Sequence, residues 1–511
     1  MTATAELRGQ DVVAAVPKGL LIDGEWVDPV TPRSLAVQNP ATGEQLAVVA
    51  DAGAQDADRA LAAACAAAAG WARTAPRERA ELLQRAFALT IARREQLALL
   101  ISLEMGKPLA EARGEVDYGA EYLRWFAEEA VRIDGRVAHA PNGDGELLVT
   151  RGPVGPCLLI TPWNFPLAMA TRKLAPALAA GCTAILKPAA ETPLTALAFA
   201  DILCECGLPP GVVNVVVTAE PALTVGPLLG DRRLRKLSFT GSTAVGRRLV
   251  RDAAEQVLRV SLELGGNAPF LVLADADLDQ ALDAAMVAKM RNGGEACTAA
   301  NRFLVHRSLA DAFAHGLAER MAALVVGPGT QPGVEVGPLI HERQRAKVDE
   351  LVRDAIARGA TALTGGEPLA GPGAFYAPTV LHEVPHAARL LHEEIFGPVA
   401  PVVPFDDEAE AIRRANDTEY GLVAYVMSGD LAHGLRVAGR LETGMVAINR
   451  GVVSNPAAPF GGMKASGLGR EGGAEGIDEY LETRYAALAL PAWPGGRAVP
   501  GGPDAGRHER G

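Results

Sequence analysis

The chain has 511 residues, of which 49% are hydrophobic and 22% charged, a composition typical of a soluble globular protein long enough for two large lobes. Its net charge is -12, from 49 Lys and Arg against 61 Asp and Glu, which argues against a nucleic-acid-binding surface. No apolar run reaches the length of a membrane span, and the first residues lack the pattern of a signal peptide. We therefore expect a cytoplasmic protein that does not bind membranes.

Both ends of the chain predict tails. Residues 1–18 are rich in Ala, residues 491–511 are rich in Pro, Gly and Arg, and both read as poorly ordered. The Ala- and Leu-rich stretch at 54–130 predicts helices. A turn signal at 142–145 predicts a hairpin, and residues 479–489 predict a late strand.

From residue 157 to residue 263 short apolar runs alternate with segments of helical length. Right-handed crossovers would gather such strands into a Rossmann-type parallel sheet that binds ligands at the carboxyl ends of its strands. A second alternating series, with strands at 269–273, 302–305 and 445–448, predicts a second α/β lobe. In the first series the expected strands are 157–160, 183–186, 212–217, 237–239 and 260–262, and the expected helices are 168–180, 193–206, 221–229 and 243–256.

Cys297 and Glu263 are the candidate nucleophile and base. A thiolate adds to a carbonyl carbon, and a carboxylate can then activate the water that hydrolyses the thioester. Glu263 follows an apolar strand and precedes two glycines, so burial would raise its pKa toward the range of a general base. A lone Cys is more often a small buried hydrophobe, and a lone Glu more often a surface ion-pair partner.

The remaining Cys and His patterns predict no disulfide framework and no metal. The six cysteines form no C-x-x-C pair, and Cys204 and Cys206 lie in an apolar helical stretch that favours core packing. Residues 382–386 match H-E-x-x-H, but Pro385 would break the helix that a zinc site needs, so a surface turn is expected.

Further motifs surround the candidate nucleophile and base. Their order and spacing resemble those of the aldehyde dehydrogenase superfamily from about Leu20 to about Leu490. These motifs are Thr-Pro-Trp-Asn-Phe-Pro at 161–166, Leu-Lys-Pro at 186–188, Phe-Thr-Gly-Ser-Thr at 239–243 with Gly246, Glu-Ile-Phe-Gly-Pro at 394–398 and Pro-Phe-Gly-Gly at 459–462.

The resemblance implies the fold class and the domains. It implies an α/β, aldehyde dehydrogenase-like fold with a Rossmann-type cofactor lobe, an α/β catalytic lobe and a small bridging β element that joins subunits into a homodimer or homotetramer. The expected divisions are a tail at 1–18, a cofactor-binding domain at 19–136 and 155–265, a catalytic domain at 266–474, a bridging element at 137–154 and 475–490, and a second tail at 491–511.

The resemblance also implies the catalytic roles. Asn164 and the backbone N–H of Cys297 would form the oxyanion hole, although Asn164 alone could be an ordinary turn residue. Glu263 would activate the deacylating water. Lys173 and Glu471 match positions associated with proton relay, and their alternative is a plain ion pair.

Expulsion of hydride from the adduct requires an acceptor, which implies NAD or NADP. The G-x-G-x-x-G fingerprint is absent, but the segment that begins at Gly241 opens a helix and can present N–H groups to pyrophosphate. Ala190 stands where strictly NAD-dependent relatives carry a Glu, so a 2′-phosphate is not repelled. The resemblance assigns Trp163, Lys187, Ala190, Gly241, Ser242, Gly246, Glu394 and Phe396 to the cofactor site.

Two further departures concern the nucleophile. Glu295 replaces the Gln common two residues before it and would raise the pKa of the thiol if its carboxylate pointed inward. Ala299 stands where some succinate-semialdehyde dehydrogenases carry a second, redox-active Cys.

Within the superfamily the resemblance is closest to the succinate-semialdehyde dehydrogenases. It implies that Arg172, Arg291 and Ser454 bind a substrate carboxylate, with Phe460 beside them. Succinic semialdehyde is the first expected substrate, and glutaric semialdehyde or a broad range of aldehydes are the alternatives. A cysteine hydrolase or thioesterase, which would want a histidine such as His306, and a non-catalytic structural protein are the competing classes.

Overall fold

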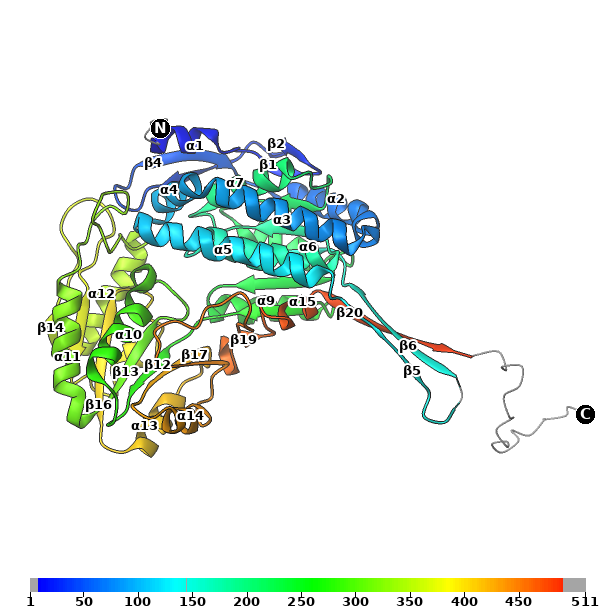
Figure 1. The fold of residues 1–511 in the computed structure, drawn as a ribbon. Coiled ribbons are helices and arrows are strands. Elements are labelled where there is room, and N and C mark those ends of the chain that lie inside the picture. Colours follow the sequence, from blue (N-terminus) through cyan, green and yellow to red (C-terminus); the bar gives the residue numbers. More distant parts are fainter. Residues whose placement is uncertain (1–7, 144, 490–511) are drawn as a thin grey trace, which may run out of the picture.

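The computed structural model describes residues 8–143 and 145–489 of the chain. Two large sheets form two lobes, and a three-stranded arm projects from one side (Figure 1). The first sheet has the order β19-β11-β10-β7-β8-β9-β1-β2. Its strands are β1 Leu20–Ile22, β2 Glu25–Val27, β7 Cys157–Ile160, β8 Ala184–Lys187, β9 Val213–Val215, β10 Lys236–Thr240, β11 Arg259–Glu263 and β19 Gly467–Leu468.

The central strands of this sheet, from β11 through β9, are parallel. Successive strands run outward from β7 in one direction and from β10 in the other, so the strand order reverses between β7 and β10. Ligands of such sheets bind in the crevice beyond the carboxyl ends of the strands at this reversal. Thr161 to Asn164 follow β7 and Gly241 follows β10, so the topology places these motifs at one edge of the sheet.

Helices bury both faces of the first sheet. Leu159 packs into one cluster with α3 to α7, whereas Leu158 packs into the other with α2, α8 and α9. Because alternate residues point to opposite faces, both faces require apolar residues, which explains the continuous apolar runs in the sequence. The helices are α2 Ala54–Arg73, α3 Pro76–Ala92, α4 Arg94–Met105, α5 Leu109–Ala130, α6 Pro166–Ala180, α7 Pro193–Glu205, α8 Pro221–Leu229 and α9 Thr243–Ala254.

The second sheet has the order β14-β15-β16-β13-β12-β17-β18 and is parallel except at its β14 edge. Its strands are β12 Ala268–Val272, β13 Ala300–His306, β14 Thr361–Thr364, β15 Thr379–His382, β16 Val399–Phe405, β17 Val423–Met427 and β18 Met445–Ile448. Its covering helices are α10 Leu278–Met290, α11 Arg307–Ala322, α12 Glu342–Ala357, α13 Glu408–Asn416 and α14 Leu431–Ala438.

The arm consists of β5 Arg136–His139, β6 Glu146–Pro153 and β20 Leu481–Leu488, paired antiparallel in the order β20-β6-β5. It stands clear of both lobes in Figure 1. The predicted hairpin and late strand are therefore confirmed. The short helix α15 Glu475–Asp478 precedes β20, and the strands β3 Ser34–Gln38 and β4 Gln45–Ala50 form a separate two-stranded sheet.

The elements expected from the apolar runs are present within a few residues of their predicted bounds. The domain boundaries stay predictions, but the expected N-terminal tail is wrong for residues 9–15. These residues form helix α1, Gly9–Ala15, which buries Val12 and Val13 in the first lobe's core. Residues 1–7 and 490–511, which include the other predicted tail, lie outside the described residues. Among the described residues, no helix combines the length and apolar character needed to cross a membrane.

Candidate active site

A cavity of about 230 Å³ lies where the carboxyl ends of β7, β10 and β11 meet the segment that follows α10. Most of the predicted site residues line it together. These are Trp163, Asn164, Arg172, Gly241, Ser242, Glu263, Arg291, Cys297, Glu394, Phe396, Ser454 and Phe460. Lys173, Lys187, Ala190, Gly246 and Glu471 do not line this cavity.

Cys297 enters the cavity from an unusual turn. After α10 the 3₁₀ turn Arg291–Gly294 contains Asn292 and Gly293 in the left-handed region, with φ of 58° and 60°. The carbonyl of Cys297 then packs so closely on Gly266 that a Cβ on Gly266 would lie 2.5 Å from it. Burial raises the pKa of the thiol to about 12, with Arg172 and Arg291 opposing this rise and Glu394 and Glu263 adding to it.

Glu263 is the last residue of β11 and is 2% exposed. Burial, together with the charge of Glu471, raises its pKa well above the ordinary value, against the opposing charges of Arg172 and Lys173. Both of its carboxylate oxygens lack a hydrogen-bond partner among the described residues. Such a group on a cavity wall is chemically suited to accept a proton from a bound water.

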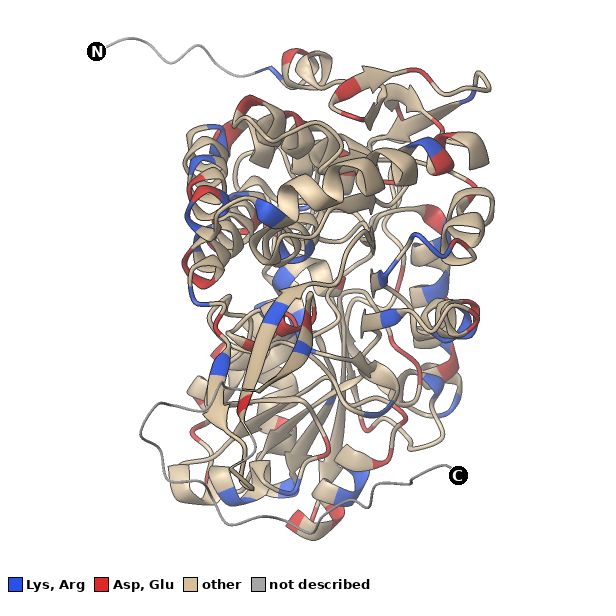
Figure 2. Cartoon of the chain, turned by 90° about the vertical axis from the view of Figure 1, so that its right-hand side faces the viewer, with Lys and Arg blue, Asp and Glu red and all other residues tan. Residues whose placement is uncertain are grey.

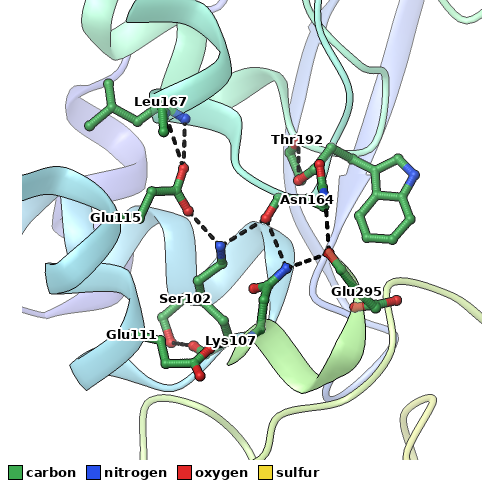
Figure 3. A network of polar contacts seen from close by, with 11 residues as sticks. Ser102, Lys107, Glu111, Glu115, Asn164, Leu167, Thr192 and Glu295 are labelled. Carbon is green, nitrogen blue, oxygen red and sulfur yellow. Dashed lines mark hydrogen bonds and ion pairs between the residues drawn. The ribbon is translucent and has the colours of Figure 1, made fainter. Parts of the chain in front are cut away.

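Asn164 is 5% exposed and is fixed on several sides, as Figure 3 shows. Its Nδ2 donates to the carbonyl of Glu295 at 2.9 Å. Its backbone carbonyl accepts hydrogen bonds from Lys107 Nζ at 2.8 Å and from Asn292 Nδ2 at 3.1 Å. Because an amide carries two N–H groups, one remains for a ligand in the cavity.

Lys173 and Glu471 lie behind the cavity wall in a buried charge cluster. Glu471 Oε1 is 2.5 Å from Lys173 Nζ, and Glu471 Oε2 is 2.5 Å from Arg172 Nε. Burial opposes the charge on Glu471, but the two cations hold the pKa of its carboxyl below the ordinary value. This is the ion pair of the alternative interpretation, and it also connects electrostatically to Glu263.

Two arginines enter the cavity against aromatic rings. The guanidinium of Arg172 lies 4.2 Å from the ring centre of Phe460. That of Arg291 lies 5.0 Å from Phe165 and 5.6 Å from Tyr118, and Nη1 of Arg291 donates to Ser454 Oγ at 3.2 Å. Stacking on rings leaves the edge of a guanidinium available for a bidentate partner such as a carboxylate.

The residues present fit a dinucleotide. Ser242 caps the N-terminus of α9, accepting from Val245 N at 3.4 Å, which leaves first-turn N–H groups next to Gly241 on the cavity wall. A Cβ on Gly265 would lie 2.9 Å from Glu394 Oε2, so this backbone must stay bare beside that carboxylate. Gly246 has a packing role, because a Cβ there would meet Leu264 at 2.4 Å.

Glu394 and Phe396 are held from α12. Lys347 Nζ donates to the carbonyl of Glu394, and Gln344 Nε2 donates to that of Phe396, each at 2.7 Å. The ring of Phe396 meets the ring of Trp163 edge-on, with centres 5.3 Å apart. Gln344 and Lys347 lie outside every motif quoted in the sequence analysis, so they were not predicted as site residues.

Several other lining residues were given no role in the sequence analysis, some because they lie on distant or apolar segments and some, such as Pro162, Phe165 and Thr240, although their motifs were quoted. Tyr118 on α5 is the clearest case, and its hydroxyl is 2.7 Å from that of Tyr122 one helical turn on. The remaining ones are Pro162, Phe165, Met169, Thr240, Leu264, Gly265, Ala296 and Thr298.

The carboxylate of Glu295 is turned away from the thiol. Its Oε1 accepts from Ile340 N at 3.2 Å, and the side chain lines a separate small cavity. Burial raises its own pKa well above the ordinary value, and the main shifts in the pKa of Cys297 come from burial and from other charges, Arg172 and Glu394 first among them.

Neither His306 nor the H-E-x-x-H segment at 382–386 lines the cavity. His306 caps α11 and bonds Ser308, so it offers Cys297 no partner. His382 ends β15 and pairs with Asp311 at 3.1 Å, and Glu383 has φ of 52°, so the H-E-x-x-H residues leave a strand and are not on one helix face.

Comparisons with known proteins agree with this geometry. Residues 26–486 match the profile of the aldehyde dehydrogenase family. The chain is 61% identical over 446 residues to succinate-semialdehyde dehydrogenase of Paenarthrobacter nicotinovorans, a match that covers 87% of this chain and 99% of that protein. It is 49% identical over 467 residues to glutarate-semialdehyde dehydrogenase of Pseudomonas aeruginosa, covering 91% and 96%.

The fold is similar to that of a crystal structure of an NADP-dependent enzyme of Escherichia coli, with a TM-score of 0.92, 46% identity and coverage of 95% of this chain and 100% of that one. The predicted fold class, family and enzyme class are confirmed by these matches. A profile that spans nearly the whole chain and a relative that is 61% identical leave one assignment. The chain belongs to the aldehyde dehydrogenase family.

Proposed function

We propose that the chain oxidises short aldehydes that carry a carboxylate at the far end, with succinic semialdehyde first and glutaric semialdehyde second. The observation that carries the proposal is the pair of ring-stacked arginines, Arg172 and Arg291, in the cavity of Cys297, with Ser454 bonded to Arg291. In a chain of net charge -12, an anionic substrate needs such local cations. The names of the two semialdehyde dehydrogenases above support the same substrate class.

The proposed chemistry starts at Cys297. Its thiol releases a proton to solvent, the resulting thiolate adds to the aldehyde carbon, and the carbonyl oxygen becomes an oxyanion to which the free N–H of Asn164 and the backbone N–H of Cys297 donate. A nicotinamide held beside Glu394 would supply the hydride acceptor, and loss of hydride from the substrate carbon would leave a thioester on Cys297. Glu263 then takes a proton from water, and the resulting hydroxide attacks the thioester. Collapse of this adduct breaks the C–S bond, and the departing thiolate takes the proton of the carboxylic acid, so that the product leaves as a carboxylate and the thiol is restored.

The other proposed roles rest on the resemblance to the aldehyde dehydrogenase family. Lys173 and Glu471 would pass the proton from Glu263 away from the cavity, since both charges act on its carboxyl. Gly241 and Ser242 would hold the pyrophosphate, Lys187 the adenosine ribose, and Glu394 the nicotinamide ribose, with Trp163 and Phe396 beside it. We also propose a cytoplasmic homodimer or homotetramer that is joined through the arm.

Arg291→Ala should lower kcat/KM for succinic semialdehyde by roughly tenfold or more, because a charge-assisted hydrogen bond contributes about 1.5 to 3 kcal/mol. Arg172→Ala should do the same. Butanal, which has no carboxylate to lose, should be affected far less. Arg345→Ala is the matched control, since this guanidinium pairs with Glu342 outside the cavity. Equal losses on both aldehydes would remove the carboxylate assignment.

We propose that NADP is used at least comparably with NAD. Burial lowers the pKa of Lys187 and the charge of Glu191 opposes this shift, so Glu191 is a carboxylate whose charge competes at this site. Ala190→Glu should shift the ratio of kcat/KM values toward NAD by placing a second carboxylate at the ribose. Glu191→Gln should leave that ratio nearly unchanged. A wild-type enzyme without NADP activity, in which Glu191→Gln weakens NAD, would assign the ribose to Glu191 instead.

A further inference from the structure

We propose that Lys107 is a positioning residue for the oxyanion-hole amide of Asn164, an inference that rests on the proposed role of Asn164. Lys107 does not line the active-site cavity, so it acts through Asn164 and touches no substrate. Figure 3 shows the network in which it sits.

The ammonium of Lys107 is buried, and its contacts are with Asn164, with the next residue in the chain and with Glu115. Nζ donates to the carbonyl of Asn164 at 2.8 Å and to Glu115 Oε2 at 2.5 Å, and it lies 3.9 Å from the ring centre of Phe165. The same ammonium therefore contacts both residues of the Asn164–Phe165 peptide, one through its backbone carbonyl and the other through its ring. The backbone of Lys107 is fixed in turn, because its carbonyl accepts from Ser102 Oγ at 2.6 Å.

Glu115 ties the same ammonium to the helix that carries Arg172. Its Oε1 accepts from Leu167 N at 2.9 Å and Ala168 N at 3.3 Å, the first-turn donors of α6. A carboxylate at a helix N-terminus is stabilised by these otherwise free N–H groups. The pair of Lys107 and Glu115 thus sets where α6 begins relative to Asn164.

The network continues to the nucleophile. Asn292 Nδ2 donates both to the carbonyl of Asn164 and to that of Glu295, and Asn164 Nδ2 donates to the Glu295 carbonyl as well. Glu295 lies two residues before Cys297, whose backbone N–H is the other proposed oxyanion donor. One hydrogen-bond network therefore joins Asn164 to the segment that carries the backbone N–H of Cys297. Lys107 is the cation of this network that binds Asn164 directly.

The inference predicts a specific loss. Without the ammonium, the backbone carbonyl of Asn164 loses one of its two side-chain donors and retains the bond from Asn292. Because the backbone of Asn164 is then held less firmly, its side-chain amide can turn from the direction that the oxyanion requires. Displacement of a catalytic group by about 1 Å can lower the rate constant by up to about a hundredfold. Lys107→Met should therefore slow formation of the acyl-enzyme roughly ten- to a hundredfold.

The test follows acylation of Cys297 by p-nitrophenyl acetate without cofactor, because that thioester also forms through an oxyanion. The first-turnover rate constant of p-nitrophenolate release is measured for the wild type, Lys107→Met, Asn164→Ala and the double variant. Partial misfolding lowers the burst amplitude and not this rate constant. If Lys107 acts through Asn164, the double variant should be no slower than Asn164→Ala, within about threefold.

Two further variants sharpen the test. Glu115→Gln removes the anchor of the ammonium and should show the same non-additivity with a smaller loss, even if Lys107→Met fails to fold. Arg79→Met is the matched control: this buried guanidinium caps the other end of α6, donating to Ala179 O at 3.0 Å, and its loss should leave the rate constant unchanged.

Losses that multiply in the double variant, or a wild-type rate constant in Lys107→Met, would overturn the positioning role and leave the proposed function intact. A wild-type rate constant in Asn164→Ala would instead overturn the oxyanion role of Asn164, and the inference about Lys107 with it.

Discussion

Cys297→Ala should reduce the dehydrogenase rate below about one-thousandth of wild type while the protein still binds NADP or NAD. The reason is that the substitution removes the thiol that would add to the aldehyde carbon, whereas the proposed cofactor contacts lie on other elements. Formation of reduced cofactor measures the first effect, and titration calorimetry with the cofactor measures the second.

Cys65→Ala is the control for loss of a thiol, because Cys65 lies on α2, away from the cavity, and should keep wild-type activity. Substantial turnover by Cys297→Ala would contradict the covalent mechanism. Loss of cofactor binding together with activity would mean that the substitution disturbs the fold of the site.

Glu263→Gln should slow steady-state turnover by about a hundredfold or more, with a burst of reduced cofactor in the first turnover. The thiol still accepts the aldehyde, but the deacylating water has lost its base. Because burial and Glu471 raise the pKa of Glu263, the fraction of base rises with pH. Wild-type deacylation should therefore accelerate as pH rises through that pKa, and the Gln variant should lose this dependence.

Glu295→Gln supplies the matched control, since it neutralises a neighbouring buried carboxylate that faces Ile340 and not the thiol. It should show no burst and near-wild-type turnover. Glu263 is not the base if the Gln variant hydrolyses its acyl-enzyme at the wild-type rate.

The sequence predicted the five parallel strands of the first sheet, and β12, β13 and β18 of the second, because buried parallel strands require uninterrupted apolar runs, as in Cys157–Ile160. Helix α1 was missed for the opposite reason. Its seven residues carry no long apolar pattern of their own, and the burial of Val12 and Val13 against the first lobe stabilises it. Short helices of this kind depend on tertiary packing that no local pattern records.

The site residues likewise fall into those that could be predicted from the sequence and those that could not. Residues at the ends of strands, such as Asn164 and Glu263, could be placed because the topology brings these ends together. Tyr118 and Lys107 could not, since they belong to the segment of α4 and α5, and only tertiary packing brings Tyr118 to the cavity wall and Lys107 to Asn164 behind it. The direction of Glu295 was also open, because a carboxylate beside a nucleophile can face either side of its own loop.

The most direct test of the whole account is the identity of the covalent intermediate. Glu263→Gln is mixed with succinic semialdehyde and NADP, quenched in acid during the burst, and digested for peptide mass spectrometry. We expect one succinyl group, attached to Cys297, and no such adduct when NADP is omitted. Product formation by the wild type without any adduct in the variant, or a succinyl group on a different residue, would contradict the account.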